Sequence, residues 1–132
     1  MLDMGSLRSK KIFIKIQSFL EKMKSKIVFE NERVKKSFEK LKNSKTEDKN
    51  LYKWLIRAFE DLETDPFSGT QIAKKIIPKE YEKKYGKLDN LWKYDLPNAW
   101  RLIYTIKNQE IIVLSVVLEW MDHKEYERRF KF

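Results

Sequence analysis

The sequence predicts an α+β domain in which a small antiparallel sheet of about four strands carries an αα-hairpin on one face. Three observations support this fold class. Apolar and aromatic residues alternate with others from Trp92 to Ile106, which is the period expected of half-buried strands. Residues 110–120 are apolar at odd and even positions alike, as in a central strand covered on both faces. Two stretches with helical spacing precede these strands, at residues 31–41 and 46–62.

Residues 1–24 are predicted to form an N-terminal extension ahead of a single domain at residues 25–132. Apolar residues at 12, 13, 16, 19, 20 and 23 fall on one stripe of a basic amphipathic helix. We expect this stripe to pack on the domain or on a second copy, which would make a homodimer, because monomers rarely expose such a patch. Lys15 and Gln17 interrupt the apolar run, so no signal peptide is expected. A membrane-surface or calmodulin-target helix is the alternative.

The domain is expected to begin with a short strand at residues 26–29, followed by two helices. Asn31 is expected to cap the first helix, and Thr46 to cap the second. The second helix should end before Asp65-Pro66, because the residue before a proline disfavours helical backbone. Two helices with a short polar connection form an αα-hairpin, whose apolar stripes we expect over one face of the sheet.

The strands after residue 91 are predicted to form a hairpin with a three-residue turn at Pro97-Asn98-Ala99. A loop of odd length keeps the even positions of both strands on one face, and those positions carry the large apolar side chains. The odd face shows Lys93, Asp95 and Arg101. We therefore predict a buried even face and an open, electropositive odd face, with a second turn at residues 107–109.

Residues 69–90 are the least regular segment, broken by Pro78 and Gly86. Lysines are frequent in it, and together with two arginines near the chain end they are candidates for contacts with RNA phosphates. The alternative is a solvated surface. The candidate set is Lys74, Lys75, Lys84, Lys87, Arg128 and Arg129.

Composition narrows the classes of function. The formal net charge of +9 favours an anionic partner such as RNA, DNA or an acidic polypeptide. Residues 1–49 hold 14 Lys and Arg against 7 Asp and Glu, whereas residues 50–132 hold 15 against 13. The absence of cysteine excludes disulfides and thiolate ligands and fits a cytoplasmic location. With one histidine, no metal site and no cofactor are expected, and no stretch reaches the roughly 20 apolar residues of a membrane span.

The residues that carry chemistry are few. RNA cleavage by the neighbouring 2′-hydroxyl needs a base, an acid for the leaving 5′-oxygen, and cations for the charge that builds on the phosphate. A cation-bearing sheet face with one histidine and one tyrosine at its edge can fill these roles without a metal. The candidates are Arg101, Lys93, His123 and Tyr126.

Structural roles compete with each of these assignments. Arg101 lies opposite Asp95 in the predicted hairpin, where a cross-strand ion pair is common. His123 can be a solvated or capping residue, and Tyr126 can place its ring in the core beside Phe130. The tryptophans of the even face are interpreted as core residues, not as platforms for RNA bases: Trp92, Trp100 and Trp120.

The order of these elements resembles the RelE/ParE superfamily of toxins from type II toxin–antitoxin pairs. The matching pieces are the strand at 26–29, the two helices, the strand WRLIY at 100–104, the apolar strand at 111–118 and the cluster from His123 to Tyr126. The resemblance covers residues 25–132. The common tail of the family has five residues from His to Tyr, whereas Tyr126 follows His123 by three.

The resemblance implies a RelE-like toxin, a metal-independent mRNA endoribonuclease that acts on ribosome-bound mRNA, inhibits translation and is held inactive by a cognate antitoxin. It implies that Arg101 clamps the phosphate and that His123 is the leading acid or base, with Lys93 and Tyr126 as further members of the set. Two alternatives remain. One is a ParE-like or catalytically degenerate member that acts by binding a protein, and the other is a basic RNA-binding module without cleavage.

Overall fold

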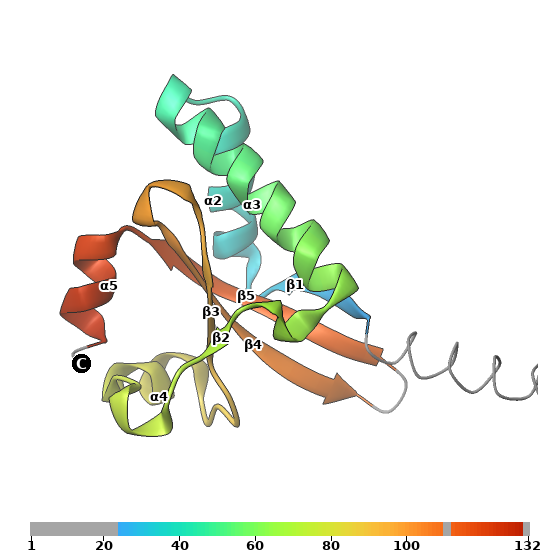
Figure 1. Cartoon of the computed structure of the whole chain (residues 1–132), viewed down its shortest axis with the longest axis vertical. Coiled ribbons are helices and arrows are strands. Elements are labelled where there is room, and N and C mark those ends of the chain that lie inside the picture. Colours follow the sequence, from blue (N-terminus) through green and yellow to red (C-terminus); the bar gives the residue numbers. More distant parts are fainter. Residues whose placement is uncertain (1–23, 110–111, 131–132) are drawn as a thin grey trace, which may run out of the picture.

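The computed structural model describes residues 24–109 and 112–130, and it confirms the α+β class (Figure 1). Five strands form one sheet in the order β1-β5-β4-β3-β2. The strands are β1 (Ser25–Phe29), β2 (Thr70–Gln71), β3 (Trp92–Asp95), β4 (Arg101–Gln109) and β5 (Ile112–Met121). The helices of the described part are α2 (Glu32–Lys42), α3 (Thr46–Thr64), α4 (Lys79–Tyr85) and α5 (His123–Arg129).

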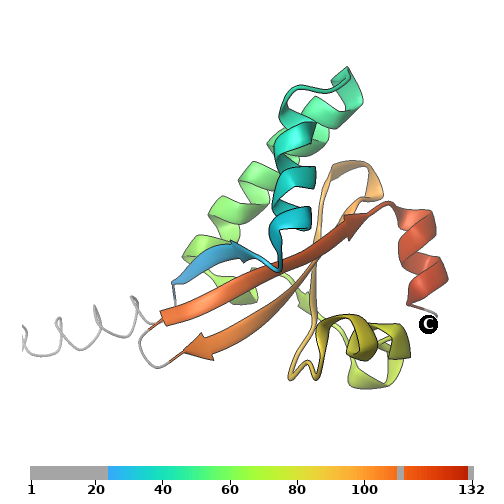
Figure 2. The ribbon, with the colours of Figure 1, turned by 180° about the vertical axis from the view of Figure 1, so that it is seen from behind.

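The sheet is mixed, where the sequence predicted about four antiparallel strands. The first strand, β1, pairs in parallel with β5, while the other neighbouring strands are antiparallel (Figure 2). The helical hairpin and the three strands after it separate β1 from β5 in the chain, so β1 reaches β5 by a long crossover, as parallel pairs require. The strand that was not predicted is β2, which lies in residues 69–90, the segment described above as the least regular.

The β3–β4 hairpin has the predicted register. Trp92 pairs with Tyr104 and Asp95 with Arg101, so even positions face even positions across the two strands. The turn at Pro97–Ala99 contains two residues with positive φ, Asn98 and Ala99, which let it reverse within three residues. The predicted second turn at 107–109 is wrong, because β4 continues through Gln109 and pairs there with Ile112 of β5.

The even face of the sheet packs against α2 and α3, as predicted. Asn31 caps α2 by accepting a hydrogen bond from Val34 N at 3.0 Å, but Lys45 and not Thr46 is the N-cap residue of α3. The buried core here joins α3 to β4 and β5. It comprises Val34, Leu51, Leu55, Ala58, Phe59, Leu62, Leu96, Leu102, Tyr104 and Val117, with Trp92, Trp100 and Trp120 packed against it.

The odd face is also covered, so the prediction of an open odd face is wrong. A second core lies under α4 and α5, on the side of the sheet away from the helical hairpin (Figure 1). It comprises Ile72, Tyr81, Leu91, Ile103, Val116, Leu118, Met121, Tyr126 and Phe130. The physical reason is that Ile103 and Val116 are apolar on this face, so leaving it in water would expose strand residues that helices can bury.

The predicted amphipathic helix near residues 12–23, and with it the homodimer interface, lies outside the described residues. None of the helices that the structure describes is both long enough and apolar enough to cross a lipid bilayer. The boundary between the extension and the domain stays a prediction.

Candidate functional site

Four of the chemically active side chains meet at the end of the odd face next to the β3–β4 turn. Lys93 and Asp95 come from β3 and Arg101 from β4. Because Arg101 also pairs with Met121 near the end of β5, the chain turns into α5 beside it and brings Tyr126 to the same place. The sheet register therefore assembles residues that are up to 33 positions apart in the sequence.

Asp95 holds the two cations of this cluster together. Its Oδ1 accepts a hydrogen bond from Lys93 Nζ at 2.9 Å and lies 3.0 Å from Arg101 Nε. The second contact is a charge pair without hydrogen-bond geometry, since Arg101 Nε has no hydrogen-bond partner, while Nη1 donates to the Trp100 carbonyl at 3.2 Å. The alternative prediction of a cross-strand ion pair is thus met. The cluster keeps one net positive charge.

Tyr126 lies against both cations. Its ring centroid is 5.6 Å from the Arg101 guanidinium carbon and 5.8 Å from Lys93 Nζ, within the range of cation–π attraction. The ring also stacks on Phe130 with centroids 4.8 Å apart, so it belongs to the odd-face core as well. Burial raises the pKa of the Tyr126 phenol, although the Arg101 charge works in the opposite direction, so the hydroxyl carries its proton at neutral pH.

Lys93 and Arg101 are more enclosed than an open cationic face would be. Their side chains are only 19% and 16% exposed, whereas that of Asp95 is 57% exposed. The ring of Tyr126 lies against the charged ends of both side chains. A ligand would therefore approach the cluster from the side of Asp95, at the rim of the sheet.

His123 takes a different position from the one that the sequence suggested. It is the first residue of α5, just after Asp122, which caps the helix by accepting from Glu125 N at 2.9 Å. Its Nε2 lies 2.9 Å from Glu127 Oε1 on the same helix, and its side chain is 49% exposed. Within the described residues, no contact joins His123 to Arg101 or Lys93. The structure places it near the cluster but not in it.

The predicted RNA-binding cations divide into two groups. Lys74, Lys75, Lys84 and Lys87 are exposed, on a short turn at Lys74–Ile76, on α4 and just after α4. The two arginines of α5, by contrast, both bind the carboxylate of Glu125. Those hydrogen bonds lower the pKa of Glu125 to about 2. Arg129 is additionally paired with Glu119 on β5, which leaves it little capacity for a phosphate.

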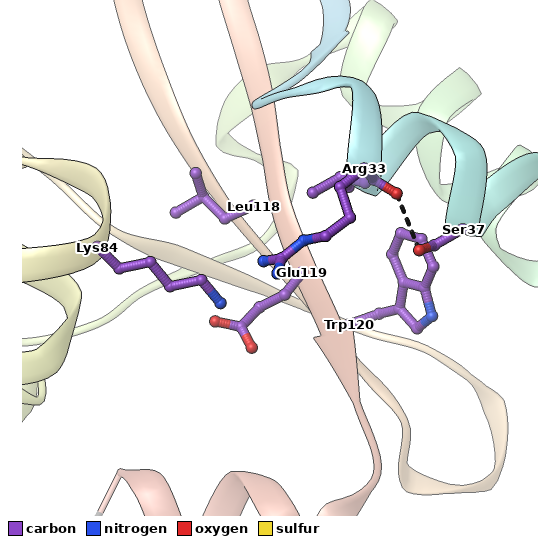
Figure 3. A pocket seen from close by; sticks show the side chains of 7 residues that line it. Arg33, Ser37, Lys84, Leu118, Glu119 and Trp120 are labelled. Carbon is purple, nitrogen blue, oxygen red and sulfur yellow. Dashed lines mark hydrogen bonds between the residues drawn. The ribbon is translucent and has the colours of Figure 1, made fainter.

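A second polar cluster, which sequence reasoning missed, surrounds Glu119 on the odd face of β5. The Glu119 carboxylate accepts a hydrogen bond from the Tyr85 hydroxyl at 3.1 Å and pairs with Arg129. It lies beside a groove of about 250 Å³ between α2, α4 and β5, into which Arg33 and Lys84 point from opposite sides (Figure 3). The available signal was an acid in an apolar strand, where a charge needs a partner.

Among the described residues, no group of three or more His, Cys, Asp or Glu side chains is arranged to hold a metal ion. What the first cluster offers instead is two cations, a protonated phenol and a carboxylate at one rim of the sheet. Such a set can bind an anion and can move a proton.

The chain matches the family described as ParE toxin of type II toxin-antitoxin system, parDE, over residues 28–119. It therefore belongs to this family and to the RelE/ParE superfamily of toxins, as the resemblance predicted, and its expected partner is a cognate antitoxin. No curated protein and no solved structure gives a significant match. The family match includes Lys93 and Arg101 and ends before α5, so it does not reach His123 or Tyr126.

Proposed function

We propose that this toxin is a RelE-like endoribonuclease that cleaves mRNA on the ribosome and so inhibits translation, without a metal ion. The observation that carries the proposal is the convergence of Lys93, Arg101 and the ring of Tyr126 at one rim of the sheet. Two cations beside a protonated phenol match the needs of a phosphate that gains negative charge while a leaving oxygen gains a proton.

In the proposed reaction the 2′-hydroxyl oxygen bonds to the adjacent phosphorus and the bond from phosphorus to the 5′-oxygen breaks. The products are a 2′,3′-cyclic phosphate and a 5′-hydroxyl, so atoms and protons balance without water. Arg101 and Lys93 stabilise the charge on the phosphoryl oxygens, and Tyr126 donates a proton to the leaving 5′-oxygen. His123 makes no contact with Arg101 or Lys93 among the described residues, and we assign it as the acceptor of the 2′-hydroxyl proton because the family resemblance implies an acid or base there. The phosphate replaces Asp95 as the partner of Arg101, which the exposure of Asp95 permits.

The test is cleavage of programmed mRNA on ribosomes by the wild type and single variants. Arg101→Ala should lower the rate about a hundredfold or more, because a preorganised charge donor is lost. Arg101→Lys should restore only part of it, because an ammonium cannot reproduce the two-pronged contact of a guanidinium. The matched control is Lys107→Ala, an exposed cation at the far end of β4, which should cleave as the wild type does.

His123 and Tyr126 are tested in the same assay. His123→Ala should lower the rate by roughly a hundred- to ten-thousandfold if it is the base. Tyr126→Phe keeps the ring in the core but removes the proton, so it should lower the rate while circular dichroism stays unchanged. Normal cleavage by both the Arg101→Ala and the Tyr126→Phe proteins would reject this site.

A second candidate function is supported by the state of the cations. Asp95 engages both Lys93 and Arg101, and His123 is paired with Glu127, so all three groups already have carboxylate partners within the protein. In that case the toxin is ParE-like and acts by binding a protein target. Growth arrest on induction, relieved by the antitoxin but without mRNA cleavage, would support this reading. Salt-dependent RNA binding without cleavage or arrest would instead indicate a basic RNA-binding module.

A further inference from the structure

Glu119 occupies an enclosed position on the odd face of the sheet. Its side chain is 15% exposed and lies on β5 among the apolar residues that face α4 and α5. A carboxylate in such a place is costly unless its partners are fixed by hydrogen bonds. Among the described residues, Arg129 of α5 pairs with it and Tyr85 of α4 donates a hydrogen bond to it, so one carboxylate ties both helices to β5.

The helix that Arg129 belongs to needs this attachment. With seven residues, α5 is too short to be stable by itself, so its order comes from tertiary contacts. Phe130 and Tyr126 supply apolar burial, but burial is roughly proportional to area and has no preferred direction. An ion pair with hydrogen-bond geometry is directional. The contact between Arg129 and Glu119 can therefore set the rotation and the axial position of the helix.

Arg129 lies about one helical turn after Tyr126 on the same helix. It is further fixed by Glu125, which accepts from Arg129 Nε at 2.6 Å and lies next to Tyr126 in the sequence. Fixing Arg129 on β5 thus fixes the turn that carries Tyr126. The ring centroid of Tyr126 lies 5.6 Å from the Arg101 guanidinium carbon and 5.8 Å from Lys93 Nζ. A small rotation of α5 would therefore separate the ring from both cations.

We propose that Glu119 and Arg129 are positioning residues that hold α5 on β5, so that the ring of Tyr126 stays against Arg101 and Lys93. Neither residue touches the substrate in this role. The catalytic consequence rests on the proposed endoribonuclease function, while the structural part stands without it. Arg129, a candidate for RNA contacts from the sequence, is here assigned to the internal support of the site.

The experiment uses the full chain labelled with ¹³C in its tyrosine rings. The Tyr126 signal is assigned from its loss in Tyr126→Phe. In Arg129→Gln the Tyr126 ring signal should shift and broaden, while that of Tyr104, which is buried on the other face of the sheet, should stay in place. The matched control is Lys124→Gln, which removes an exposed cation of the same helix that pairs with no carboxylate among the described residues.

Cleavage kinetics provide the second measurement. Arg129→Gln should lower kcat about ten- to a hundredfold with a much smaller change in KM, because a misplaced catalytic group costs rate more than binding. Arg129→Lys should recover part of the rate, since it keeps a cation for Glu119. Lys124→Gln should remain near the wild-type rate.

Two results would overturn the proposal. One is an unchanged Tyr126 signal in folded Arg129→Gln, and the other is an equal response in Lys124→Gln, which would indicate general loosening of α5. If Arg129→Gln does not fold, Glu119→Gln answers the same question with a nearly isosteric change that removes the charge. A Tyr126 signal that responds as expected in a protein without nuclease activity would reject the proposed function and keep the positioning role.

Discussion

The two faces of the sheet differ in the side chains that they carry. The face under α2 and α3 is a continuous apolar core that contains several ring contacts, among them Phe29 with Phe38 at 5.3 Å and Phe38 with Tyr52 at 4.9 Å. The face under α4 and α5 combines apolar residues with charges. Every ion pair found among the described residues lies on that second face or on α5.

This difference separates stability from chemistry. The helical hairpin face has a mainly apolar interior whose buried hydroxyls, on Ser115 and Tyr104, are hydrogen-bonded, and this interior holds the strands in register. The opposite face can then carry Lys93, Arg101 and Glu119, because the cost of enclosing these charges is met by a fold that is already stable. The predictions below test this division by changing one face at a time.

The largest effect is expected in the hairpin core. Leu55 of α3 is fully buried there, so Leu55→Ala should lower the free energy of unfolding by about 2–5 kcal/mol, through lost burial and a residual cavity. Urea denaturation followed by circular dichroism measures the loss. A decrease below about 1 kcal/mol would show that this face is not the main source of stability.

The matched substitution on the other face is Phe130→Ala. Phe130 is also fully buried, but it follows a short helix at the end of the described chain, which can detach while the sheet persists. Hydrogen exchange should show lost protection in α5 and retained protection in α3. Equal loss of protection in both helices would remove the proposed division between the two faces.

A smaller effect is expected at Gly69, which directly precedes the edge strand β2. A Cβ added there would lie 2.4 Å from the Lys93 carbonyl oxygen and 2.6 Å from the Tyr104 hydroxyl. Gly69→Ala should therefore displace β2 from β3 and cost about 1–3 kcal/mol, as overpacking does. Thermal melting measures this change. Thr70→Ala, an exposed neighbour on β2, is the control, and equal melting temperatures for both variants would refute the steric account.

Much of the fold could be predicted because its signals are local. Alternation and turn residues determined the β3–β4 register, and with it the facing pair of Asp95 and Arg101. The cap at Asn31 and the break before Pro66 marked helix ends. The prediction of an open odd face was wrong because residues 79–85 form a helix that covers this face and buries Tyr81. That helix lies in a lysine-rich segment without a strong apolar period, so no sequence pattern indicated it.

The candidate site was less predictable because it depends on distant residues. Apolar residues on both sides of β5 indicate that both faces of the sheet are covered, and β4 lies beside β5 in the same sheet. This pattern implied a second core but did not show which residues form its cover. The meeting of Tyr126 with Arg101 depends on how α5 turns after β5. The pair of Glu119 and Arg129 joins residues ten positions apart in two elements, and no local pattern encodes such a contact.

A still smaller difference is expected between the two helix starts of the hairpin. Asn31 caps α2 through its side chain, whereas Lys45 at the start of α3 makes no side-chain cap bond. Asn31→Ala should cost about 1 kcal/mol in the free energy of unfolding, because Val34 N loses its acceptor. Lys45→Ala, the matched change at the uncapped end, should alter stability by less than about 0.5 kcal/mol. Equal costs in urea denaturation would contradict the cap assignment.

The smallest expected effect concerns the acid sensitivity of the charged face. Hydrogen bonds from Arg128 and Arg129 lower the pKa of Glu125 from 4.5 to about 2. A carboxyl whose pKa is lower in the folded state contributes its stability above the unfolded value, and this contribution is lost as the pH falls from about 4.5 toward 2. The loss should be confined to α5, because no ion pair supports the hairpin core among the described residues.

Hydrogen exchange at about pH 5 and about pH 2.5, corrected for intrinsic rates, should show α5 opening more often at the lower pH while α3 does not. Glu125→Gln should have weaker α5 protection than the wild type at about pH 5 and should change less between the two values, since its amide has no charge to lose. Wild-type α5 protection that is the same at both pH values would mean that the arginine pairs of Glu125 do not hold the helix, and that its apolar contacts are sufficient.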